Sequence, residues 1–114
     1  MKLNEIAKRL ELTVRTASDR LDVEVTGGYA SDLLSDVIAN AGKGNIWVTL
    51  QTHQNVVAVA VLRDLSGIII VNGRKPEEET LKKAEEEKIP IMVTELPTFE
   101  LVGRLYKLGV SGMR

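Results

Sequence analysis

The chain of 114 residues contains no cysteine and one histidine, His53. The absence of cysteine excludes disulfide bonds, thiolate nucleophiles and cysteine metal ligands. A single histidine excludes a metal cluster built from several imidazoles. We therefore expect no cofactor, and no metal site built from cysteine or from several histidines.

The chain also lacks an apolar run of 18 residues and an excess of either charge. Its 15 basic and 16 acidic residues give a net charge of −1, which argues against a generally basic nucleic-acid binder. Without a long apolar run we expect no membrane span, and without the apolar core of a signal peptide we expect a cytoplasmic location. The length favours one domain over residues 1–114.

What is present is an alternation of strand and helix patterns. Apolar residues at helical spacing predict a first helix over 3–10. Two alternating segments, 12–16 and 22–26, predict strands, and Gly27-Gly28 ends the second of them. From there the pattern predicts helices over 33–41, 77–88 and 96–108, and strands over 46–51, 67–71 and 89–94. This order indicates an α/β fold of three layers, with a largely parallel sheet flanked by helices.

Residues 54–63 allow two interpretations. Their valines favour a strand, here an antiparallel one. However, two neighbouring parallel strands over 46–51 and 67–71 need a crossover of about a dozen residues, usually a helix. We therefore predict a buried helix over 54–63.

Several motifs in a fixed order resemble the DRTGG domain family. They begin at Thr26-Gly27-Gly28, continue through residues 47–60 and 67–74, and end near residue 91. The resemblance covers residues 20–110 and implies a fold like the N-terminal domain of HPr kinase/phosphorylase. Such domains accompany CBS domains and some phosphotransacetylases as regulatory modules. The match departs from the family name at Glu24 and Val25, where Asp and Arg would stand.

Family members are often labelled serine kinases, but this chain has no Gly-x-x-x-x-Gly-Lys-[Ser/Thr] phosphate loop. It is therefore not a kinase by itself, and the resemblance favours a stand-alone, non-catalytic regulatory or ligand-sensing module.

Polar and glycine residues gather where the predicted parallel strands end, which is where such sheets bind ligands. The sequence thus predicts a site for a small anionic or nucleotide-like ligand at this edge. Its members, joined by Thr94 and Glu95 from the last strand, are Gly27, Gly28, Thr49, Gln51, His53, Asn72 and Arg74.

Each member also has an ordinary structural explanation. The glycine pair suits an anion site before a helix or a plain turn with Asp32 as helix cap, and Arg74 suits an anion or a surface loop. His53 suits a ligand contact or an acid–base role in a small enzyme, and equally a cap on the following helix. Asp32 and Asp36 lie one turn apart and suit Mg²⁺ or, more simply, a cap and a solvated carboxylate.

Other residues suggest further hypotheses. Residues 3–18 also look like the start of a helix-turn-helix with its recognition helix at 14–18, which would bind DNA. Trp47 and Phe99 are predicted core residues. Residues 56–62 have no polar side, so a partner subunit is expected to cover the helix over 54–63 in a homodimer. The alternative is coverage by helices of the same chain.

Overall fold

Five strands form one sheet in the order β1-β5-β4-β3-β2 in the computed structural model, which describes residues 1–112. Strands β2 to β5 are parallel, and β1 pairs antiparallel with β5. This confirms the α/β fold with a largely parallel sheet. The strands are β1 (Thr13–Val14), β2 (Gly27–Ala30), β3 (Asn45–Thr49), β4 (Gly67–Ile70) and β5 (Ile91–Val93).

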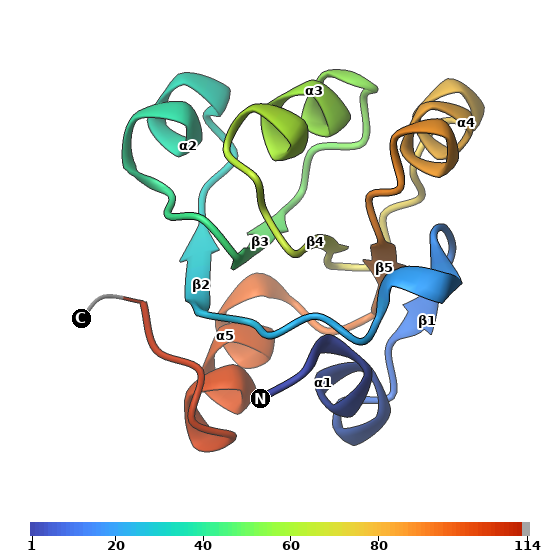
Figure 1. Cartoon of the computed structure of the whole chain (residues 1–114). Helices are drawn as coiled ribbons and strands as arrows, with labels where there is room; N and C mark the ends of the chain where they lie inside the picture. Colours follow the sequence, from blue (N-terminus) through green and yellow to red (C-terminus); the bar gives the residue numbers. More distant parts are fainter. Residues whose placement is uncertain (113–114) are drawn as a thin grey trace.

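The helices cover both faces of the sheet (Figure 1). Helices α2, α3 and α4 lie on one face, and α1 and α5 lie on the other. The first three share a face because the parallel strands are laid down in chain order and each crossover has the same right-handed sense. The helices are α1 (Leu3–Arg9), α2 (Leu34–Asn40), α3 (Asn55–Leu62), α4 (Glu78–Glu87), α5 (Thr98–Lys107) and the 3₁₀ turn η1 (Ser18–Arg20).

The core is two apolar layers divided by the sheet. Ile46 and Val48 of β3 point to the layer under α1 and α5, whereas Trp47 between them points to the layer under α2, α3 and α4. Since both faces are covered, the strands read as continuous apolar runs. The core position of Trp47 is confirmed, with no exposed surface, but that of Phe99 is wrong. Phe99 is 92% exposed because it lies on the outward side of α5.

Residues 54–63 form a helix, as predicted. Helix α3 connects the parallel neighbours β3 and β4, so topology overrides the strand propensity of its valines. Val56, Val57, Val59 and Ala60 are buried between α3 and the sheet. Many of the apolar residues of α3 therefore belong to the core of the chain itself.

The strand predicted over 22–26 is wrong. This segment instead hydrogen-bonds the N-terminal residues: Leu3 N donates to Val23 O, and Val25 N donates to Met1 O. Its alternating pattern reflects this short contact, which includes one isolated bridge between Lys2 and Glu24. Strand β2 therefore begins at Gly27, one residue after the predicted strand ends.

The helix-turn-helix prediction is also wrong. Residues 14–18, the predicted recognition helix, run from the end of β1 to the start of η1 and pass through Ala17 at φ +51°. The apolar side of α1 is buried in the core. Neither element is thus free to enter a DNA groove as that motif requires.

Within residues 1–112, no helix combines the length and the apolar character needed to cross a lipid bilayer.

Candidate functional site

The carboxyl ends of the parallel strands bring together most of the predicted site residues. Thr49, Gln51 and His53 follow along β3 and the β3–α3 loop, and Asn72 and Arg74 lie in the β4–α4 loop. Because β3 and β4 are parallel neighbours, these side chains share one edge of the sheet. We call this edge, with Asp32 and Glu95 of the flanking loops, the carboxyl edge.

Gly27 and Gly28 lie at the opposite edge, so their predicted place in the site is wrong. They begin β2 rather than follow a strand. Gly28 N donates a hydrogen bond of 2.9 Å to Ser111 O, and a Cβ on Gly27 would lie 2.9 Å from that same oxygen. The glycine pair thus lets the C-terminal segment pass close to β2, and it forms no anion-binding turn before a helix.

Asp32 occupies the place at the carboxyl edge that the glycines were expected to fill. Its Oδ1 accepts hydrogen bonds from Thr49 Oγ1 at 3.0 Å and from Leu50 N at 2.7 Å. Gln51 Nε2 donates to the carbonyl oxygen of Asp32 at 2.8 Å. These bonds tie the loop after β2 to the loop after β3. The position of Asp32, two residues after β2, was a sequence signal for this role. It could not be recognised without knowing that β2 ends at Ala30.

The remaining roles proposed for Asp32 and Asp36 do not match their contacts. Ser31 Oγ, rather than Asp32, accepts the N–H of Leu33 before α2. Asp36 bonds to Tyr29 and Asn40, away from the contacts of Asp32. In the part of the chain that the structure describes, no group of three or more histidine, aspartate or glutamate residues is placed to hold a metal ion.

His53 holds the start of α3. Its Nδ1 accepts a hydrogen bond of 3.1 Å from Asn55 N, which matches the capping interpretation. In the neutral ring the proton must then lie on Nε2, because Nδ1 acts as an acceptor. The side chain is exposed, so Nε2–H is a donor available to a ligand at the carboxyl edge.

The loops after β4 and β5 diverge to opposite faces of the sheet, which is the arrangement that opens a ligand crevice in α/β folds. Here the two loops are bonded together: Asn72 N donates to Leu96 O at 2.8 Å, and Gly73 N donates to Thr94 O at 3.0 Å. Gly73, at φ +69°, lies so close to the carboxylate of Glu95 that a Cβ would be 2.6 Å from its Oε1. The crevice between these two loops is therefore bridged.

The carboxyl edge carries charges of both signs. Arg74 and Lys75 are exposed cations in the β4–α4 loop. Glu77, Glu78 and Glu79 follow directly at the start of α4. An anionic group at this edge would be attracted by Arg74 and Lys75 and repelled by these glutamates.

On the α2 side of the sheet, Tyr29 and Asp36 form a hydrogen-bonded pair of ionisable groups. Tyr29 Oη donates to Asp36 Oδ2 at 2.8 Å. This hydrogen bond lowers the pKa of Asp36, with help from Ser31 and Asn40, because it stabilises the carboxylate. The same bond raises the pKa of the Tyr29 hydroxyl. The pair links β2 to α2.

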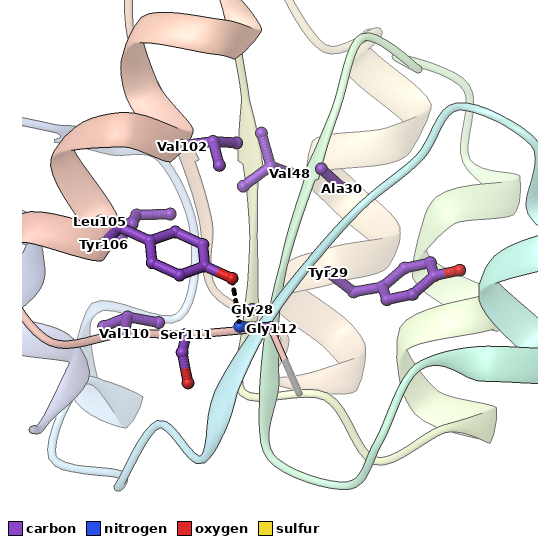
Figure 2. Close-up of a pocket in the computed structure, with 10 residues that line it drawn as sticks. All are labelled: Gly28, Tyr29, Ala30, Val48, Val102, Leu105, Tyr106, Val110, Ser111 and Gly112. Atoms are coloured by element: carbon purple, nitrogen blue, oxygen red, sulfur yellow. Dashed lines mark hydrogen bonds between the residues drawn. The ribbon is translucent and has the colours of Figure 1, made fainter. Parts of the chain in front are cut away.

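An apolar cavity of about 250 Å³ lies between β2, α5 and the C-terminal segment (Figure 2). Val48, Val102, Leu105 and Val110 form much of its wall, and Tyr106 Oη accepts a hydrogen bond from Gly112 N at 3.2 Å beside it. This cavity could not be predicted from the sequence, because its walls come from segments far apart in the chain. It has few polar groups with which to orient a ligand.

Comparison with known proteins gives one family and one fold. The DRTGG domain profile matches residues 5–108. No curated protein matches the chain. Among solved structures, the chain resembles the CBS and DRTGG domains of the regulatory region of Clostridium perfringens pyrophosphatase, complexed with its activator diadenosine tetraphosphate. The TM-score is 0.69 at 15% identity, covering 90% of this chain and 44% of that one. The likeness shows a shared fold, and the chain spans less than half of that regulatory region.

Proposed function

Because the chain belongs to the DRTGG domain family, we propose that it is a non-catalytic regulatory module that senses a small anionic or nucleotide-like ligand at the carboxyl edge. The observation that carries the proposal is the meeting of polar side chains from four loops at one edge of the sheet. These loops are tied together by hydrogen bonds, so a ligand meets a largely preformed surface.

Three exposed side chains at the carboxyl edge carry hydrogen-bond donors, namely His53, Asn72 and Arg74. His53 offers Nε2–H, and Arg74 offers a planar guanidinium that pairs with a phosphate through two bonds. Asn72, at φ +63°, lies in the turn directly after β4, and its backbone N–H donates to Leu96 O of the β5–α5 loop. Thr49 and Gln51 contribute by positioning, since both are held by Asp32.

The related regulatory region supports the nucleotide-like class. That region comprises CBS and DRTGG domains and is complexed with diadenosine tetraphosphate. The carboxyl edge has few cations beside several glutamates, so we infer that a ligand binds with one phosphate near Arg74 rather than along a continuous basic surface.

A thermal-shift assay tests this function. The probes are diadenosine tetraphosphate, ATP and inorganic phosphate. A probe at 100 times its Kd stabilises the fold by about 2.7 kcal/mol, which is on the order of 10 °C in Tm for a domain of this size. We expect the shift to be lost when Arg74→Ala and His53→Ala are combined.

Lys43→Ala is the matched control, because Lys43 is an exposed cation on the α2–β3 loop, away from the carboxyl edge. It should keep the full shift. No shift with any probe, or a shift unchanged in the double variant, would rule out the proposed site. A turnover screen of the same probes checks the non-catalytic assignment: product formation that disappears in His53→Ala would make this an enzyme instead.

A further inference from the structure

The outward face of α3 is apolar although it is exposed. Val61 is 46% and Leu62 is 64% exposed, and Ala58 beside them is also exposed. Arg63, the first charged residue after the helix, folds toward α2 and donates from Nη2 to Ala41 O at 2.8 Å. The outward face of α3 is therefore left without a charge, which is unusual for the surface of a single domain.

A groove runs along this face between α3 and α4. Its α3 wall consists of Val57, Ala58, Val61 and Leu62, and its α4 wall carries Lys83 and Glu87. Lys83 Nζ and Glu87 Oε2 are 3.6 Å apart, and both side chains are nearly half exposed. The groove thus has an apolar floor with one positive and one negative group along a single side.

We propose that this face binds a second copy of the chain, as a two-fold homodimer with the two α3 helices packed antiparallel. The charge pattern selects this partner. Lys83 and Glu87 lie one turn apart on α4, about 6 Å along its axis. Consider a two-fold axis that is perpendicular to the helices and crosses α4 at the level between Lys83 and Glu87. This axis brings Lys83 of each copy beside Glu87 of the other copy.

The same axis passes near the middle of α3, because Ala58 and Val61 lie in the same groove as Lys83 and Glu87. Ala58 is small enough to let the two helices approach closely, and Leu62 of each copy then packs against apolar surface. The face is thus self-complementary in both charge and polarity, as an isologous interface requires. This interface is separate from the carboxyl edge and goes beyond the proposed ligand-sensing function.

Sedimentation equilibrium at micromolar concentration tests the dimer. The expected mass is twice the 12.5 kDa of the chain. Val61→Glu should give a folded monomer, because position 61 is exposed on the proposed interface. Phe99→Glu is the matched control: it adds the same charge at a 92% exposed apolar position on α5, across the sheet, and should leave the dimer intact. A monomeric wild type, a dimeric Val61→Glu, or dissociation by Phe99→Glu each overturns the proposal.

Charge reversal at Lys83 and Glu87 is a second test. Both side chains are partly exposed, so these substitutions should leave the fold intact. Lys83→Glu and Glu87→Lys alone each place like charges across the axis and should raise the dimer Kd by on the order of tenfold or more. The double variant restores opposite charges across the axis and should return the Kd to near its original value. Single variants without effect, or a double variant as weak as the singles, count against this geometry.

Discussion

At the scale of single residues, Gly27 shows why a glycine has to be interpreted from what lies beside it. Its backbone is ordinary extended strand, so no turn requires glycine at this position. What excludes a side chain is Ser111 O, which would lie 2.9 Å from an added Cβ. Glycine therefore allows the C-terminal segment to hydrogen-bond the open edge of β2, and this covers part of an edge that would otherwise be free to pair with another chain.

We therefore expect Gly27→Ala to destabilise the fold. The new methyl group displaces Ser111 and breaks its bond from Gly28 N, which lowers the free energy of unfolding by about 1 kcal/mol or more. Gly103→Ala is the control, since Gly103 lies in α5 and an added Cβ meets no atom within 4 Å. That variant should gain roughly 0.5–1 kcal/mol because alanine favours helix. Urea denaturation measures both values, and a gain in both would contradict this role of Gly27.

At the scale of elements, a buried threonine joins the N-terminal segment to the sheet. Strand β1 has two residues, and beyond it Thr16 is only 3% exposed. The Thr16 hydroxyl donates to Ile89 O at 2.7 Å and accepts from Ile91 N at 2.8 Å. One hydroxyl therefore satisfies two buried backbone groups at the point where the chain leaves α4 and enters β5. The Thr16 side chain thus extends the contact with β5 beyond the two paired residues of β1.

Replacing this hydroxyl tests its contribution. Thr16→Val keeps the shape of the side chain but leaves Ile89 O and Ile91 N without their partner, so the free energy of unfolding should fall by about 2 kcal/mol or more. Thr16→Ser keeps the hydroxyl and loses one methyl group, which costs about 1 kcal/mol. Chemical denaturation of the two variants gives the comparison. An equal loss in both would mean that packing, rather than hydrogen bonding, accounts for the burial of Thr16.

At the scale of the whole molecule, the pair formed by Tyr29 and Asp36 contributes to the dependence of stability on pH. The folded state lowers the pKa of Asp36, mainly through the bond from Tyr29. Below the unfolded value of about 3.9, the unfolded chain therefore binds more protons than the folded chain. The stabilisation from Asp36 is present above that value and is lost as the pH falls through the lowered pKa. Tyr29 behaves in the opposite sense: its raised pKa gives a contribution that is present below pH of about 10 and lost as the pH rises through the folded value.

Tyr29→Phe should therefore flatten both ends of the pH profile. Removing the hydroxyl reduces the loss of stability on acidification below pH of about 4, because Asp36 then keeps only its remaining partners such as Asn40. It also removes the alkaline loss that belongs to Tyr29. Urea titrations across the pH range measure these slopes, with Tyr106→Phe as the control for loss of a tyrosine hydroxyl elsewhere. Unchanged slopes in Tyr29→Phe would contradict the assigned cause.

The sequence alone determined the fold class, the family and the helix over 54–63. These rest on local periodicity and on a rule of topology: two parallel neighbours need a crossover, so the valines of α3 had to form a helix in spite of their propensity. The polar residues after β3 and β4 could be placed at one edge for the same reason, since parallel strands end on the same side.

Only the tertiary structure decided which edge Gly27 and Gly28 occupy, and which face of α5 carries Phe99. The edge that the two glycines occupy depends on where β2 begins. The alternating pattern of 22–26 reflects contacts with the N-terminal residues and does not mark a strand of the sheet. That shift of a few residues moved the glycines to the amino end and brought Asp32 to the carboxyl edge. Periodicity describes which residues share a side, but the partner that a segment pairs with is set by contacts between distant parts of the chain. A shift in the limits of one strand therefore exchanges the residues at its two ends.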